Sequence, residues 1–135
     1  MIKWDDAYST GILILDEQHK KLFQYLNDLE GAIHEKDVGN ELMLNVLNFF
    51  QDYINIHFGT EESCMHKHHC PVAQANQNAH RRFIEFFDGY KERLSAKAMN
   101  RQLLKELLKF SEDWIVEHIC KIDVQLKPCV ETASD

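Results

Sequence analysis

Four segments of the chain repeat apolar residues at steps of three and four positions, the pattern of a helix with one buried face. Each repeat also contains polar side chains that can bind a metal ion. The repeats are His19, Leu22, Leu26, Leu29 and Ile33; Phe50, Ile54, His57 and Glu61; Ala73, Asn76, His80, Phe83, Phe87, Tyr90 and Leu94; and Leu104, Leu108, Ser111, Ile115, His118 and Ile122, with Asp123 beside the last. The sequence therefore predicts four helices whose buried faces share a polar centre.

The bounds of these helices follow from capping residues and helix breakers. Asp16 is the predicted N-cap of a first helix that ends near Glu35, after an irregular arm over residues 1–15. The second helix is expected over about 41–67, the third from near Pro71 to about 94, and the fourth from about 101 to the region of Asp123. A tail from residue 127 is separated from it by Pro128. Short connections at 37–40 and 95–100 predict an all-α fold, an antiparallel up-down-up-down four-helix bundle with an irregular N-terminal arm.

Length and charge narrow the function classes. A chain of 135 residues with 44% hydrophobic content suits one domain over residues 1–135. The formal charge of −7 and the absence of a basic stripe argue against a nucleic-acid partner. The sequence has neither a signal-peptide pattern at its start nor an apolar run long enough for a bilayer, so we expect no membrane partner and a soluble, cytoplasmic protein.

Six of the buried positions suggest a metal site. Separate core histidines, each hydrogen-bonded to a backbone carbonyl, are the ordinary alternative for any single position. An ionised Glu61 or Asp123 in an apolar core, however, is destabilising unless paired, and no Lys or Arg occupies the repeats. A cation is the simplest partner, and imidazole with carboxylate suits iron first and manganese second. The predicted metal ligands are His19, His57, Glu61, His80, His118 and Asp123.

The cysteines show no C-x-x-C pair, and the expectation is that all four are reduced thiols. They are Cys64, Cys70, Cys120 and Cys129. An alternative is a small zinc site at the turn between the second and third helices. It would use Cys64, His66, His68, His69 and Cys70, but their spacing matches no compact tetrahedral motif.

Several motifs occur in a fixed order along nearly the whole chain. They are Trp4, Gly11-Ile12, Asp16-Glu17-Gln18-His19, His57-Phe58-Gly59-Thr60-Glu61-Glu62, Pro71, His80-Arg81-Arg82-Phe83, Trp114, His118-Ile119 and Asp123. In these motifs the sequence resembles the hemerythrin family, most closely its single-domain bacterial members. The resemblance implies a non-haem di-iron centre in the bundle core that binds dioxygen reversibly at one iron.

The resemblance also implies a role for each ligand. Glu61 and Asp123 would bridge two iron ions, together with an oxo or hydroxo group. His19 and His57 would serve the iron with the open position, and His80 and His118 the other iron. The family pattern places a further histidine four residues before His80, and this chain has Asn76 there.

Asn76 leaves several outcomes open. The asparagine amide reaches about as far as the near ring nitrogen of histidine, so direct ligation requires a backbone shift. Water could complete the second iron with Asn76 as its hydrogen-bond partner, that iron could be weakly bound or lost, or another metal could occupy the centre. Asn76 could equally be a satisfied core amide in a degenerate site.

The expected function is oxygen binding for carriage, storage or sensing. One alternative is a di-metal redox enzyme that acts on dioxygen, peroxide or nitric oxide. Another is a signalling or interaction module whose shape depends on the metal. Binding is favoured over catalysis, because the sequence shows no further general acid or base beside the ligands and no candidate catalytic residue outside them.

Overall fold

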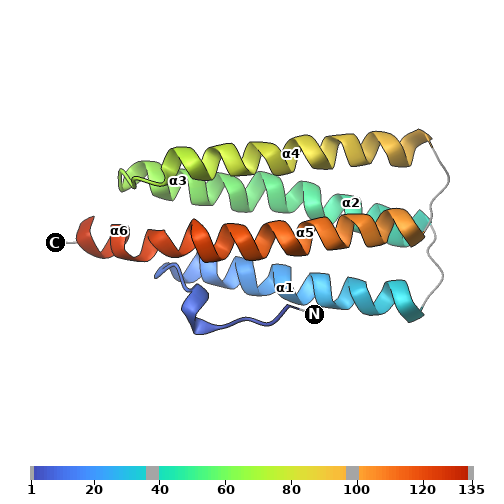
Figure 1. The fold of residues 1–135 in the computed structure, drawn as a ribbon, viewed down its shortest axis with the longest axis horizontal. Coiled ribbons are helices and arrows are strands. Elements are labelled where there is room, and N and C mark those ends of the chain that lie inside the picture. The colour runs from blue at the N-terminus through green and yellow to red at the C-terminus, as the bar shows by residue number, and fades with distance from the viewer. Residues whose placement is uncertain (1, 36–39, 97–100, 134–135) are drawn as a thin grey trace.

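The computed structural model describes residues 2–35, 40–96 and 101–133, and no strand occurs among them. Long helices follow a short 3-10 turn, with a π-helical turn and a second 3-10 turn between them (Figure 1). In chain order the elements are η1 (Asp6–Tyr8), α1 (Leu13–Glu35), α2 (Asn40–Tyr53), η2 (Ile54–Phe58), α3 (Gly59–Lys67), α4 (Ala73–Ala96), α5 (Arg101–Lys121), η3 (Asp123–Gln125) and α6 (Leu126–Ala133).

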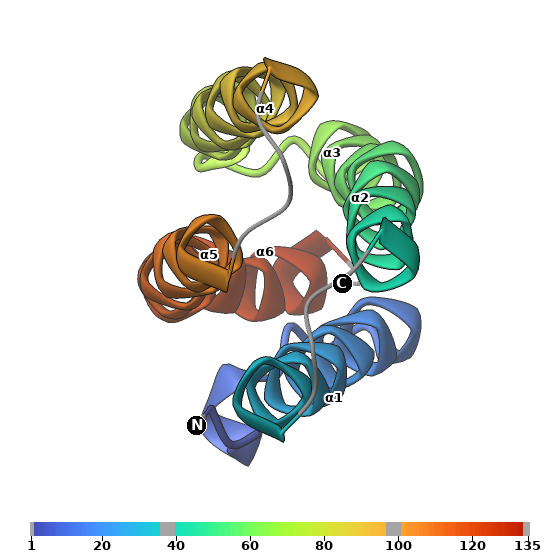
Figure 2. The same ribbon diagram turned by 90° about the vertical axis from the view of Figure 1, so that its right-hand side faces the viewer.

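The long helical segments form a four-cornered bundle. Seen end-on, α1, α2 with α3, α4 and α5 occupy the corners (Figure 2). Successive segments run in opposite directions along the bundle axis (Figure 1). The predicted all-α, up-down-up-down four-helix bundle is therefore confirmed. The connections predicted at 37–40 and 95–100 fall largely on residues 36–39 and 97–100, which lie outside the described residues.

The first helix begins earlier than predicted, because Asp16 is not its N-cap. Helix α1 starts at Leu13, which places Asp16 in its first turn. The Asp16 carboxylate turns back towards the arm and accepts hydrogen bonds from Ser9 Oγ (2.6 Å), Thr10 N (2.8 Å) and Thr10 Oγ1 (2.9 Å). Asp16 therefore fixes the arm onto the helix instead of capping it.

The rest of the arm is also held in place. Ile2 N donates to Asn27 Oδ1 (3.1 Å), and Asn27 Nδ2 donates to Ile2 O (2.7 Å). Gly11 has a φ of 79°, a conformation that glycine adopts without strain. A Cβ at this position would lie 3.2 Å from Lys127 Cγ, so the arm runs close against α6.

The second predicted helix contains a π-helical turn. The chain remains helical from Asn40 to Lys67, as predicted, but Ile54–Phe58 form i→i+5 bonds. The Thr60 hydroxyl donates to Ile56 O (2.7 Å) beside this turn. The turn carries His57, and turns of this type often occur at functional sites.

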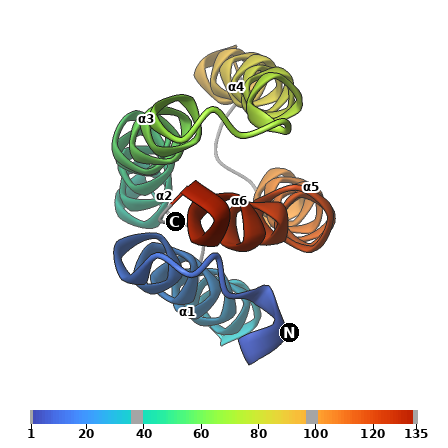
Figure 3. The same ribbon diagram turned by 90° about the vertical axis from the view of Figure 1, so that its left-hand side faces the viewer.

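The predicted C-terminal tail is instead a helix. Residues Leu126–Ala133 form α6, which lies across one end of the bundle (Figures 1 and 3). Pro128 does not prevent this, because it lies in the first turn, where a backbone N–H has no partner within the helix. Leu126 is fully buried. The prediction of a tail from residue 127 was therefore wrong.

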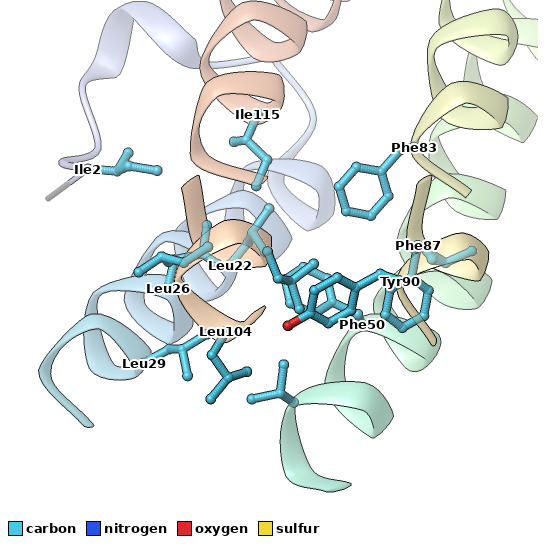
Figure 4. Close-up of a cluster of buried hydrophobic side chains, with 14 of the residues drawn as sticks. Ile2, Leu22, Leu26, Leu29, Phe50, Phe83, Phe87, Tyr90, Leu104 and Ile115 are labelled. Carbon is cyan, nitrogen blue, oxygen red and sulfur yellow. The ribbon is translucent and has the colours of Figure 1, made fainter. Parts of the chain in front are cut away.

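The core consists of two apolar clusters. The larger one fills the part of the bundle away from α6, where Phe50, Phe87 and Tyr90 pack together (Figure 4). The smaller one lies towards α6 and consists of Leu15, Met65, Cys70 and Leu126. Buried polar residues lie between the two clusters along the chain. On three segments a polar residue stands between a residue of each cluster, in the orders Leu15, His19, Leu22; Phe58, Glu61, Met65; and Ile119, Asp123, Leu126. On α4, Asn76 and His80 lie between half-buried Ala73, which packs against the smaller cluster, and Phe83 of the larger one.

The predicted inward repeats are buried with few exceptions. Ala73 and Ile122 are half-buried, and both pack against the smaller cluster. The side chain of Leu94 lies outside the described part of the chain. The spacing of three and four therefore identified the buried faces correctly, even across the π-helical turn.

The expectation of four reduced thiols was wrong for two cysteines. Cys70 and Cys129 form a disulfide across 59 residues, with their Cα atoms 5.7 Å apart. Cys64 and Cys120 are free. The alternative of a zinc site loses Cys70 as a ligand, because a disulfide sulfur is not a thiolate. The disulfide ties α6 to the segment between α3 and α4 (Figure 3).

We expect the double substitution Cys70→Ser with Cys129→Ser to lower the Tm by roughly 5–15 °C. Loss of a crosslink over a long loop releases entropy in the unfolded chain and typically costs about 2–4 kcal/mol. Thermal unfolding followed by circular dichroism measures this. Cys120→Ser is the control, because Cys120 is exposed and free. Equal Tm values for the double variant and the control would contradict a stabilising disulfide.

Candidate metal centre

Four histidines from four helical segments converge on two carboxylates between the apolar clusters. All six side chains are at most 4% exposed, so the bulk solvent does not screen them. The residues and their elements are His19 in α1, His57 in η2, Glu61 in α3, His80 in α4, His118 in α5 and Asp123 in η3. The structure thus brings together all the ligands that the sequence predicted.

Glu61 lies at the middle of this group. Its Oε2 atom is 3.4 Å from Nε2 of His19 and 3.2 Å from Nε2 of His57. Its other oxygen, Oε1, is 3.0 Å from Nε2 of His80 and 3.3 Å from Nε2 of His118. One carboxylate therefore presents a different oxygen to each pair of histidines.

Asp123 repeats this arrangement. Its Oδ2 is 3.2 Å from Nε2 of His19, and its Oδ1 is 3.0 Å from Nε2 of His118. The centre divides into two halves, each with two imidazole nitrogens and one oxygen from each carboxylate. We name them the His19/His57 half and the His80/His118 half.

The nitrogen atoms of the His19/His57 half are spaced as a metal ion requires. The Nε2 atoms of His19 and His57 are 3.0 Å apart. Two nitrogens, each about 2.1 Å from one ion and at right angles, would be separated by about 3 Å. Glu61 Oε2 and both Asp123 oxygens are buried and accept no hydrogen bond of ordinary geometry. The clusters His19, His57, Glu61 and Glu61, His80, His118 are therefore able to hold metal ions.

The charges of the metal-free centre follow from these contacts. Burial by itself lowers the pKa of His19 and His118, but their contacts with Asp123 and Glu61 outweigh it and raise both pKa values to about 9. Burial lowers the pKa of His57, and the neighbouring charge of His19 lowers it further. Burial raises the pKa of Glu61, yet its close contacts with the four histidines bring it well below its usual value. An ionised Glu61 thus faces protonated His19 and His118.

Neighbouring side chains fix the orientation of the rings. Gln18 Oε1 is 2.5 Å from Nδ1 of His57 and accepts a hydrogen bond from its N–H, which leaves the Nε2 lone pair directed into the centre. Three aromatic rings stack on imidazoles, with ring centroids 3.9–4.6 Å apart. The stacked pairs are Tyr53 with His57, Phe58 with His80, and Trp114 with His118. The rings are therefore held in place before any metal binds.

Asn76 lies on the same face of α4 as His80, one turn earlier. Its side chain is fully buried, and among the described residues neither its amide nitrogen nor its amide oxygen has a hydrogen-bond partner. This observation counts against the alternative of a core amide that the protein itself satisfies. Asn76 belongs beside the His80/His118 half as a polar group without a protein partner.

Reasoning from the sequence missed the contact of Gln18 with His57 and the π-helical turn. Gln18 precedes a predicted ligand, but its partner is 39 residues away along the chain. Only the packing of α1 against η2 creates that contact. The π-helical turn left no signal, because the spacing of apolar residues around it fits an ordinary helix.

The pKa values predict how the metal-free protein responds to pH. His19 and His118 bind protons more tightly in the folded state, so their stabilisation is complete below about pH 6.5, the ordinary histidine pKa. It is lost as the pH rises through about 9. We therefore expect the Tm of the metal-free protein to fall by roughly 5 °C or more between pH 6.5 and pH 9.5.

Calorimetry of the metal-free protein across this pH range measures the effect. In His19→Gln the fall should be about half as large, whereas His34→Gln, at an exposed position, should behave like the unaltered protein. A Tm that is constant or rises over this range would contradict protonation of the two histidines.

Comparisons with known proteins agree with this geometry. Residues 10–130 match the family model described as the hemerythrin HHE cation binding domain. A bacteriohemerythrin from Pseudomonas aeruginosa is 30% identical over 116 residues, 86% of this chain and 72% of that protein. One from Methylococcus capsulatus is 25% identical over 96% of this chain and 97% of its own. A crystal structure of wild-type hemerythrin has 26% identity and a TM-score of 0.78, and the match covers 96% of this chain and 98% of that one. The chain belongs to the hemerythrin family.

Proposed function

We propose that the protein holds two iron ions and binds dioxygen reversibly. The observation that carries this proposal is the division of Glu61 and Asp123, each of which presents one oxygen to each pair of histidines. Two ions bridged by both carboxylates and by an oxo or hydroxo group fit that division. The nitrogen and carboxylate donors favour iron, and manganese is the second choice.

Each residue has a defined part in this proposal. His19 and His57 hold one ion and His80 and His118 the other, and Glu61 and Asp123 join the two. Bound iron supplies the reversible electron transfer on which dioxygen binding depends. The stacked rings and the Gln18 hydrogen bond keep the imidazole nitrogens aimed at the centre. The apolar clusters on both sides limit access of water, which favours reversible binding over oxidation.

A hollow on the surface supports entry of a small ligand to the His19/His57 half. It has a volume of about 260 Å³ and lies between α1 and the α2–η2 segment. His57 forms part of its wall beside the apolar Leu22 and Ile56, and the charged Lys21 and Asp52 also line it. Dioxygen, a small apolar molecule, suits the apolar part of this wall. We therefore assign the oxygen-binding position to the His19/His57 half.

Carriage, storage and sensing would all use such a centre. An enzyme that reduces dioxygen, peroxide or nitric oxide is a different class, and so is a signalling or interaction module. Turnover of peroxide or nitric oxide by the iron-loaded protein would support the enzyme. A change of oligomeric state with oxygen would support the module. We place binding first, because the six proposed ligands include every buried acidic or histidine side chain among the described residues. No further carboxyl or imidazole group among these buried residues is left to act as a separate general acid or base.

We also propose that residues 1–135 form one hemerythrin domain. None of the described helices has the length and apolar character needed to cross a membrane. The cytoplasmic location stays a prediction, and the Cys70–Cys129 disulfide is the observation against it, because stable disulfides are rare in the cytosol.

Optical spectra of the anaerobic, iron(II)-loaded protein test the oxygen-binding proposal. We expect a visible charge-transfer band to appear on exposure to air and to disappear when the oxygen is flushed out with inert gas. A band that never appears, or a one-way change to an iron(III) spectrum, would contradict reversible binding. Repeating the cycle with manganese distinguishes the two metals.

Glu61→Gln should reduce the bound iron from two ions per chain to one or fewer. The neutral amide offers only one oxygen, so it cannot serve both halves or balance two cations. Elemental analysis after removal of loosely bound metal measures the stoichiometry. The control is Glu117→Gln, because that carboxylate is exposed and pairs with Lys121 on the surface. Two retained ions in Glu61→Gln would contradict the bridging role.

A further inference from the structure

Asn76 is the polar group that the proposed oxygen-binding centre does not use. It is fully buried, and both of its amide atoms lack a hydrogen-bond partner. Buried amides in native proteins nearly always have partners, because an unpaired buried amide destabilises the fold. Within the described residues no protein group fills this role. The Asn76 amide therefore needs a hydrogen-bond partner that is not part of the protein.

The position of Asn76 defines where that partner would lie. Asn76 and His80 are one helical turn apart on the same face of α4, so both point towards the His80/His118 half. The asparagine side chain is shorter than that of histidine, and all four histidine donors use the far ring nitrogen, Nε2. The amide would therefore stop short of a metal held in this half, by about the length that separates the near and far ring nitrogens of a histidine, and a small ligand would fit that interval.

A second surface hollow leads to this half of the centre. It lies between α4 and α5, has a volume of about 340 Å³, and includes His118 and Trp114 in its wall. Arg82 and Lys121 also line it, and both are exposed. Their one acidic neighbour in the wall is Glu117, whose Oε1 is 3.3 Å from Lys121 Nζ. The net positive charge favours anions.

We propose that the His80/His118 half binds a second small ligand, an inorganic anion of two or three atoms, to which the Asn76 amide donates a hydrogen bond. This inference rests on the proposed function, because it requires a metal in that half. Asn76 is a positioning and selectivity residue there: its N–H favours an acceptor, and its size leaves the coordination position open. Each half then has an open position, and the Asn76 N–H lies beside the one in the His80/His118 half. A small anion such as azide can therefore occupy both positions of the iron(III) protein, and its surroundings would differ between them.

Azide is a suitable probe, because it is linear, anionic and visible in the infrared. The test is a titration of the iron(III)-loaded protein with azide. Equilibrium dialysis counts the azide bound per chain, and infrared spectroscopy resolves the stretching bands of the bound azide. The expected result is two azide ions per chain, with two distinct bands. One azide per chain, or two that give a single band, would overturn the proposal.

Two substitutions separate the roles of Asn76. Asn76→His supplies a far ring nitrogen to the open position, so we expect one azide per chain and loss of one infrared band. Asn76→Leu keeps the volume but removes the donor, so the second azide should bind at least tenfold more weakly while the first is unchanged. Gln77→Leu, on the exposed side of the same helix, is the control and should match the unaltered protein. Unchanged azide binding in both Asn76 variants would overturn the proposal.

The outcomes distinguish this inference from the proposed function. A reversible oxygen band with one bound azide overturns only the second ligand position. Two bound azide ions without a reversible oxygen band overturn only the oxygen-binding function. One iron per chain in the unaltered protein overturns the second position, because the His80/His118 half then holds no metal.

Discussion

The fold depends on a buried carboxylate, Glu61, that contacts four imidazoles at once. Its two oxygens lie 3.0–3.4 Å from Nε2 atoms that four separate helical segments contribute. An ionised group at 0% exposure is tolerated only because these partners stabilise its charge. The four segments are therefore joined by electrostatic contacts at one level of the bundle and by apolar packing above and below it.

The layer formed by the four histidines, Glu61 and Asp123 divides the core into two unequal apolar clusters. The larger cluster packs aromatic and aliphatic side chains of the long helices around Phe50, Phe87 and Tyr90 (Figure 4). The smaller cluster contains few residues and depends on η3 and α6 for Leu126. Asp123 lies only three residues before Leu126, so the same packing that seats α6 also positions one of the two carboxylates. The Cys70–Cys129 disulfide and the close approach of Gly11 to Lys127 hold α6 from two further sides.

The two halves of the centre are alike in their donors and different in their surroundings. A hydrogen bond from His57 to Gln18 and a nearby hollow with apolar residues in its wall mark one half. An unpartnered amide, two aromatic stacks and a hollow with two basic residues mark the other. In the proposed function, a difference in ligand between the halves would come from these surroundings, because both halves have the same kinds of donor.

The sequence by itself determined the long helices, their buried faces and the six side chains that converge between the apolar clusters, because a spacing of three or four residues defines one face of a helix whatever it packs against. It did not determine α6, the disulfide or the partner of His57. The disulfide and the contact of Gln18 with His57 join residues 59 and 39 positions apart, and Pro128 signals the end of a helix as readily as the start of one. Asn76 illustrates both what the sequence determines and what it does not. The sequence placed it on the buried face, but only the tertiary structure showed that its amide has no partner there, because a hydrogen bond depends on which groups the packing brings within reach.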